Sequence, residues 1–173
     1  MRAAIRYRVA QFFRALTARV DEQDLNAALH ILPPPARTLF RRQARQDQRH
    51  ALDVYHALQR AGHTQKDLLA AALLHDVGKA DTRHPAWLRA IIVLLKRFAP
   101  RLWDQLSQGA PRGWRRTFIM HAQHAARGAQ SAQAAGCSAR TVDLIARHEE
   151  HHPVKETPTD QLLEILKTFD NRY

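Results

Sequence analysis

The sequence predicts an all-α fold, and three observations lead to this prediction. Ala, Leu, Arg and Gln recur throughout the 173 residues, whereas the chain has only 6 glycines and 7% aromatic residues. No stretch combines Val, Ile, Thr or Tyr runs with the flanking glycine turns that are typical of strands. Apolar residues instead recur at helical spacing in successive segments. The length and the 45% hydrophobic content suit one globular domain with its own core.

The first 44 residues are predicted to form an N-terminal helical extension. Residues 3–20 carry apolar side chains at helical spacing with arginines between them. A basic amphipathic helix of this kind either packs on its own domain or lies on an anionic membrane, and we expect packing. A second helix is expected over 21–32, because the triple proline at 33–35 must end it. This proline run is the predicted boundary between the extension and the main body.

Helical periodicity predicts the remaining elements in order. They are a helix from Ala36, a helix ending at Gly62, a helix over 64–74, one or two helices over 86–108 with a break near Pro100, a long helix over 114–135 closed by Gly136, a helix capped by Ser138 that continues through H-E-E, and a final helix from Thr159 or Asp160.

The formal charge of +11, from 27 basic and 16 acidic residues, suggests an acidic partner. Nucleic acid, an anionic membrane surface and phosphorylated small molecules all fit, and a genome rich in arginine codons would give the same excess. The single cysteine, Cys137, excludes an internal disulfide and a cysteine-based zinc site. The longest apolar stretch, at 86–97, is interrupted by Arg89 and is too short to span a bilayer. Without a signal-peptide pattern, the expected location is cytoplasmic.

An adjacent histidine and aspartate, His75 and Asp76, follow the apolar run D-L-L-A-A-A at 67–72. Thr64 is the expected cap of this helix, and Gly78 is its expected stop. Burial of an imidazole and a carboxylate is costly unless each finds a partner. Both groups are metal ligands, so the pair indicates a cation. The alternative is a surface-facing helix end at which the imidazole only bonds a carbonyl.

Five segments in order resemble the HD superfamily of metal-dependent phosphohydrolases, whose name comes from an adjacent His-Asp pair on a helical bundle. They read R-H-A-L-D-V-Y, D-L-L-A-A-A-L-L-H-D-V-G-K, H-A-A-R-G-A, T-V-D-L-I-A-R-H-E and L-L-E-I-L-K-T-F-D. The resemblance covers roughly residues 45 to 170. It implies an HD helical bundle over 45–173, with the extension over 1–44 left unexplained.

The resemblance also implies a metal site. Its first ion would be held by His50, His75, Asp76 and Asp170. This sulfur-free set suits Mn²⁺, Fe²⁺, Co²⁺, Ni²⁺ or Mg²⁺. His124 and His148 would either hold a second ion bridged by Asp76, or bind or protonate the phosphate, which gives one or two ions per chain.

Catalysis is expected to involve Asp76, Lys79 and His124. Lys79 would contact a substrate phosphate, or it would only neutralise a helix C-terminus. The implied activity is a metal-dependent phosphohydrolase acting on a phosphorylated small molecule, in particular a nucleotide or a related phosphate ester. The segment H-E-E-H-H-P lacks the Gly-Tyr-Pro signature of the branch that cleaves cyclic di-GMP.

A second hypothesis is a non-catalytic, metal-binding regulatory module. Such a module would dock on a protein, a membrane or a nucleic acid through the basic N-terminal helices.

Overall fold

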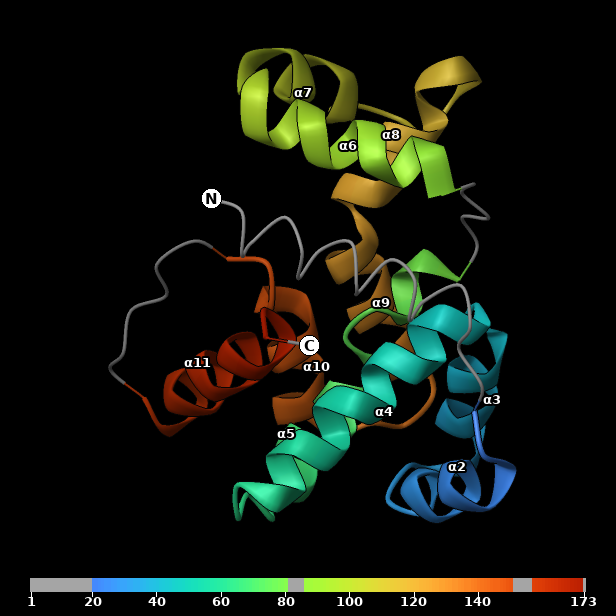
Figure 1. The fold of residues 1–173 in the computed structure, drawn as a ribbon, viewed down its shortest axis with the longest axis vertical. Helices are drawn as coiled ribbons and strands as arrows, with labels where there is room; N and C mark the ends of the chain where they lie inside the picture. The colour runs from blue at the N-terminus through green and yellow to red at the C-terminus, as the bar shows by residue number, and fades with distance from the viewer. Residues whose placement is uncertain (1–19, 81–85, 151–156, 173) are drawn as a thin grey trace, which may run out of the picture.

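The computed structural model describes residues 20–80, 86–150 and 157–172 (Figure 1). Within these ranges it contains ten α-helices, two 3-10 helices and no strand, which confirms the predicted all-α class. The elements are α2 (Glu22–Leu29), α3 (Pro34–Arg42), α4 (Arg45–Arg60), α5 (Lys66–Leu74), η1 (Val77–Lys79), α6 (Ala86–Phe98), α7 (Pro100–Ser107), η2 (Gly113–Arg115), α8 (Arg116–Ala122), α9 (His124–Ala134), α10 (Ala139–Arg147) and α11 (Pro158–Asp170).

Helix α5 forms the centre of the bundle. Every residue from Leu68 to Leu74 is buried, and the helix contacts α3, α4, α10 and α11. A helix that is apolar on all sides has to be enclosed by others. The bundle therefore delivers His75 and Asp76, at the end of α5, into its interior.

The helices before residue 45 share this core. Leu25 and Leu29 of α2 and Phe40 of α3 are buried in the same cluster as the apolar side chains of α4 and α5. Pro33 is the N-cap of α3, which therefore begins two residues before the predicted Ala36. Proline suits the first helical position, occupied by Pro34, because the first helical N–H groups have no partner in the helix. The predicted helix over 3–20 lies almost entirely outside the described residues, and the boundary at 44 stays a prediction.

Gly78 does not act as the predicted helix stop. Helix α5 ends at Leu74, and Gly78 lies within η1. A Cβ at Gly78 would overlap the carbonyl oxygen of His124 and would lie 2.8 Å from the backbone nitrogen of Gly128. The glycine is needed because η1 and α9 approach each other at backbone distance.

Two other sequence predictions about helix ends are also wrong. The N-cap of α5 is Gln65 rather than Thr64, and its side chain makes no capping bond. The predicted helix over 114–135 is divided at Gln123 into α8 and α9. Local propensity gave no sign of this break, which places His124 at the first position of a new helix.

Four other predicted helix boundaries, at Gly62, Pro100, Gly136 and Ser138, agree with the structure. Gly62 and Gly136 follow α4 and α9 with φ of +85° and +80°, a conformation that glycine adopts without strain. Ser138 caps α10 by accepting from the backbone N–H of Thr141. The break before Pro100 separates α6 from α7. The predicted C-terminal end of α10 is wrong, because the helix ends at Arg147 and does not continue through H-E-E at 148–150.

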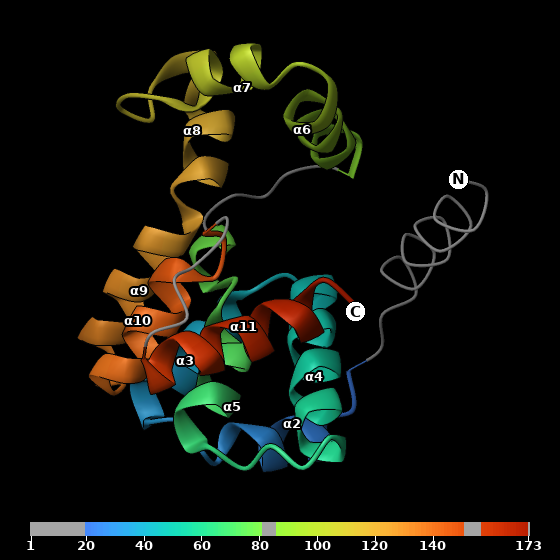
Figure 2. The ribbon, with the colours of Figure 1, turned by 90° about the vertical axis from the view of Figure 1, so that its left-hand side faces the viewer.

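Helices α6 and α7 extend from the rest of the bundle. They contact each other, and α7 contacts α8, which leads back to α9. In both views this pair occupies one end of the long axis, whereas α2 to α5 and α9 to α11 form the body at the other end (Figures 1 and 2). Among the described residues, no helix is both long and apolar enough to cross a membrane.

Candidate metal centre

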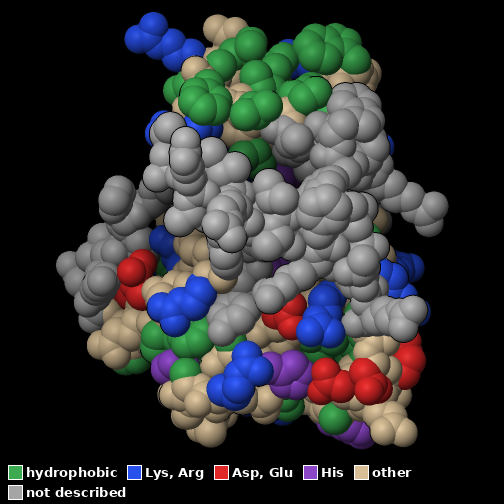
Figure 3. All heavy atoms as spheres, viewed as in Figure 1, with side chains coloured by type: hydrophobic (Ala, Val, Ile, Leu, Met, Phe, Trp, Pro, Cys, Tyr) green, Lys and Arg blue, Asp and Glu red, His purple; other side chains and the backbone are tan. Residues whose placement is uncertain are grey.

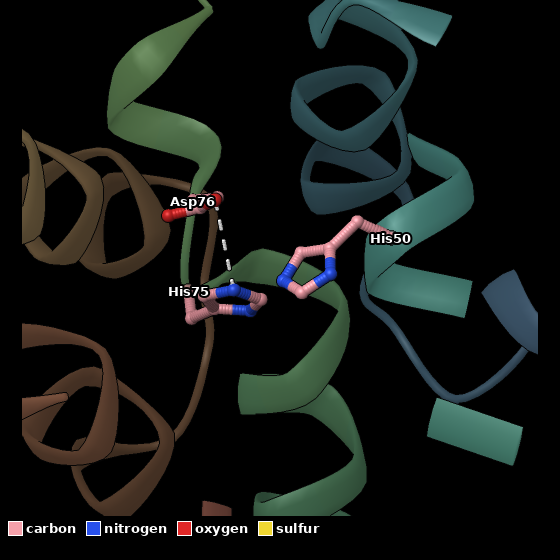
Figure 4. A group of neighbouring side chains, drawn as sticks. All are labelled: His50, His75 and Asp76. Carbon is pink, nitrogen blue, oxygen red and sulfur yellow. Dashed lines mark ion pairs between the residues drawn. The ribbon is translucent and has the colours of Figure 1, made fainter. Parts of the chain in front are cut away.

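The residues predicted as metal ligands converge from five helices. His50 lies on α4, His75 is the C-cap of α5 and Asp76 follows it. Asp170 ends α11, His124 begins α9 and His148 is the C-cap of α10. Figure 4 shows the His50 ring reaching from α4 toward His75 and Asp76. The structure therefore brings the six side chains together, although they span 120 residues of sequence.

His50, His75 and Asp170 form one side of the cluster. Nε2 of His50 lies 2.8 Å from Oδ1 of Asp170, and Nε2 of His75 lies 3.3 Å from the same oxygen. Nε2 of His75 is also 3.7 Å from Oδ2 of Asp76. Two imidazoles and two carboxylates from α4, α5, η1 and α11 thus meet at one point.

His124 and His148 form the other side of the cluster, around the second oxygen of Asp76. Their Nε2 atoms lie 3.5 Å and 3.8 Å from Oδ1 of Asp76. They lie 3.2 Å from each other. Asp76 is thus common to both sides, with one carboxylate oxygen facing each.

The three buried histidines have the same orientation. Nδ1 of His75, His124 and His148 lies 2.9, 2.5 and 2.7 Å from the carbonyl oxygen three residues earlier. A carbonyl oxygen only accepts, so each Nδ1 carries the proton and, in the neutral ring, each Nε2 presents a lone pair. In metal sites, a histidine ligand is oriented in the same way, by a hydrogen bond from the ring nitrogen that does not bind the metal.

The donor set fits a divalent cation. The Nε2 lone pairs of His124 and His148 face each other at 3.2 Å, and the buried Nε2 of His75 has no hydrogen-bond partner among the described residues. Two groups have ligand atoms within 4.8 Å of one another: His50, His75 and Asp76, and Asp76, His124 and His148. These buried groups could hold a metal ion. Nitrogen and oxygen donors without sulfur favour hard-to-borderline ions.

Lys79 belongs to the same cluster. Its Nζ lies 2.6 Å from Oδ1 of Asp76, the oxygen that faces His124 and His148. Burial favours the neutral form of both groups. Their attraction is larger, so the pKa of Asp76 lies well below its usual range and that of Lys79 is raised. Lys79 is therefore held as a cation beside the cluster. The catalytic roles of Asp76, Lys79 and His124 stay predictions.

The charges of the cluster also shift the pKa values of the histidines. Burial lowers the pKa of His75, but the carboxylates of Asp76 and Asp170 outweigh burial and raise it to about 9. The pKa of His148 is lowered to about 4 by burial and by the neighbouring His75. Burial raises the pKa of Asp170, but His75 and His50 outweigh burial and lower it.

Three residues at or beside the cluster were not predicted from the sequence: Glu149, Lys96 and His121. Oε1 of Glu149 lies 3.9 Å from Nε2 of His124, and its Oε2 accepts from Nζ of Lys96 at 3.1 Å. His121 supplies the carbonyl oxygen that orients His124, and its ring centroid lies 5.4 Å from that of His124. The position of Glu149 directly after His148 was the only available signal. No signal pointed to Lys96, which comes from the α6–α7 end of the molecule.

A cleft of about 960 Å³ leads to the cluster. His148 and Asp170 lie on its wall, together with Glu149. Lys96, Pro100 and Trp103 of α6 and α7 line one side, and Glu164, Lys167 and Thr168 of α11 line another. The volume is within the range of small-molecule sites.

Comparisons with protein-family models, with curated proteins and with solved structures find no match to this chain. The helical fold and the clustered histidines and aspartates are compatible with the HD resemblance of the sequence.

Proposed function

We propose that this chain is a metal-dependent phosphohydrolase of the HD type, acting on a nucleotide or a related phosphate ester. The observation that carries the proposal is the convergence of three buried Nε2 atoms on the two oxygens of Asp76. Each of these histidines is already fixed by a carbonyl on its other nitrogen. In the neutral rings, the Nε2 lone pairs and the carboxylate oxygens of Asp76 are all acceptors, and a divalent cation is a group that they could all bind at once.

The proposed ligands divide into two sets that share Asp76. His50, His75, Asp76 and Asp170 would hold one divalent ion, and Asp76, His124 and His148 would hold a second. When bound, such ions polarise a phosphoryl oxygen and lower the pKa of coordinated water. Nitrogen and oxygen ligands favour Mn²⁺, Fe²⁺, Co²⁺, Ni²⁺ or Mg²⁺.

Side chains beside the metal ligands would bind the phosphate and the rest of the substrate. Lys79 is a partly buried cation 2.6 Å from Asp76 and would contact a phosphate oxygen. Lys96 and Lys167 add cations to the cleft wall. Trp103 lies on the same wall, so an aromatic or sugar moiety would lie between α7 and α11. A cleft of this size would take a nucleotide in preference to inorganic phosphate.

A phosphatase panel tests this proposal. The purified chain would be assayed with Mn²⁺, Co²⁺, Ni²⁺ or Mg²⁺ on nucleoside monophosphates, cyclic nucleotides and aryl phosphates. We expect metal-dependent hydrolysis that Asp76→Asn lowers by about a thousandfold, because metal ions contribute several kcal/mol to such reactions. Asp143→Asn is the matched control, since Asp143 pairs with Arg147 on the surface of α10.

Two results would contradict the proposal. Equal hydrolysis by wild type and Asp76→Asn would place the reaction elsewhere. Bound metal without hydrolysis of any substrate would favour the second hypothesis, a non-catalytic metal-binding module.

A further inference from the structure

We propose that the outer surface of α6, α7 and η2 docks on an anionic lipid bilayer. This apolar end surface consists of Ile91, Val93, Leu94, Phe98, Leu102 and Trp114. Phe98 and Trp114 are 76% and 74% exposed, and Leu94 is 54% exposed. Figure 3 shows hydrophobic side chains gathered over this end of the molecule. An apolar group of this size at one end of a molecule marks an interaction site.

The fold supports a contact at this end. Helices α6 and α7 contact each other and α8, whereas the body of the bundle is built around α5. Ile92 is buried, but its neighbours Ile91 and Val93 are exposed, so α6 carries more apolar surface than its packing uses. With no membrane-spanning helix among the described residues, the available mode is a helix pair lying in the interface.

Charge identifies the occupant as an anionic surface. Residues 86–122 contain seven Lys and Arg residues and one acidic residue, Asp104. Lys96 and Arg115 are used inside the protein, where Lys96 pairs with Glu149 and Arg115 donates to carbonyl oxygens at the end of α7. Four other arginines of this stretch are exposed: Arg97, Arg101, Arg112 and Arg116. Exposed apolar and aromatic side chains next to arginines are typical of proteins that bind anionic bilayers.

The same charges disfavour the other occupants. A second copy docked through this end would bring like-charged arginines together. Residues 1–19 contain five arginines and no acidic residue, so they have the same sign of charge. Nucleic acid would use the arginines and could stack on Phe98 and Trp114, but it would leave the exposed aliphatic side chains Ile91, Val93, Leu94 and Leu102 in water.

Docking would bring the bilayer close to the cleft that leads to the histidine and aspartate cluster. The helices that carry the apolar end surface supply Lys96, Pro100 and Trp103 to the cleft wall. A helix with its side chains is about 10 Å across. A bilayer on the outer side of α6 and α7 would therefore lie about one helix diameter from that wall.

Vesicle co-sedimentation tests the proposal on the full chain. The probes are vesicles of phosphatidylcholine alone and vesicles with roughly one-third phosphatidylglycerol. We expect binding only to the anionic vesicles. Binding should weaken steeply when salt rises from about 0.1 M to about 1 M, because the Debye length falls from about 10 Å to about 3 Å.

Three double variants assign the binding surface. Arg97→Gln with Arg101→Gln should weaken binding about 25-fold, since each arginine near an anionic surface contributes roughly fivefold. Leu94→Gln with Phe98→Gln should weaken it by more than about tenfold, because two apolar side chains no longer enter the interface. Arg60→Gln with Lys66→Gln is the matched control. It makes the same change in charge at two exposed positions, the last residue of α4 and the first residue of α5, and it should bind like wild type.

The remaining outcomes overturn the proposal. Arg6→Gln with Arg8→Gln could lose vesicle binding while the α6–α7 variants bind fully. That result would assign membrane contact to residues 1–19. The wild-type chain could instead fail to bind vesicles and sediment as a dimer. If Leu94→Gln with Phe98→Gln then dissociated that dimer, the surface would be assigned to a second copy. Absence of binding to anionic vesicles at low salt would refute the proposal directly. Unchanged circular dichroism of each variant shows that the fold is retained.

Discussion

His75, His124 and His148 each donate Nδ1–H to the carbonyl oxygen three residues earlier and direct Nε2 at Asp76. The position of each histidine at a helix end makes this possible, since it follows or begins a helix where the local carbonyls are accessible. The rotamers are therefore set by the backbone before any ligand arrives. An ion entering the cluster would meet ligands that are already oriented.

Metal affinity should depend on pH because of His75. Without metal its pKa is about 9, so the ring is protonated at pH 7 and must lose that proton to bind an ion. Affinity for Mn²⁺ should therefore rise about tenfold per pH unit between pH 6 and pH 8, with about one proton released per chain. His148, with a pKa of about 4, is already neutral and adds no proton. Titration calorimetry in buffers of different ionisation enthalpy measures this, and an affinity independent of pH would disagree with it.

The metal count should separate the two sets of ligands. Because Asp76 belongs to both, Asp76→Asn should abolish binding, whereas His148→Gln should reduce about two ions per chain to about one. Asp143→Asn should retain the wild-type count. Elemental analysis after dialysis gives these numbers. Wild-type metal content in a folded Asp76→Asn variant would remove Asp76 from the site.

Among the elements, the close approach of η1 to α9 determines where His124 stands relative to Asp76. Gly78→Ala would place a methyl group against the His124 carbonyl and should cost about 3 kcal/mol of unfolding free energy, with weaker metal binding. Gly62→Ala is the control. Nothing lies within 4 Å of its Cβ position, and only its positive φ is strained, at about 1 kcal/mol. Urea unfolding compares the two variants, and equal losses would show that the contact is not tight.

The same elements show which features the sequence could predict. Gly62, Gly136, Ser138 and Pro100 act through local backbone chemistry, and their effects were predictable. The role of Gly78 and the break at Gln123 depend on packing between η1, α8 and α9, which no local pattern encodes.

The residues of the site also include some that the sequence could predict and some that it could not. Its histidines and aspartates were found because they lie in segments that resemble a known family. The contact between Glu149 and Lys96 depends on how α6 lies against the end of α10.

At the scale of the whole molecule, α2 and α3 share one core with the helices that hold the site. Leu25→Ala should therefore lower the free energy of global unfolding by about 2–5 kcal/mol while leaving the metal count unchanged, because Leu25 is fully buried on α2, a helix that carries none of the proposed ligands. Leu102→Ala is the control at a 45% exposed site and should change stability little. Thermal unfolding could instead show a separate early transition that Leu25→Ala abolishes. That result would mean that α2 and α3 unfold independently of the other helices.

Anomalous diffraction from crystals grown with Mn²⁺ tests the proposed metal centre most directly. We predict two peaks on either side of Asp76, roughly 3.5–4 Å apart as in other two-metal sites. One peak should be bound by His50, His75 and Asp170, and the other by His124 and His148. Absence of any peak within bonding distance of Asp76 would contradict the proposed centre and the function built on it.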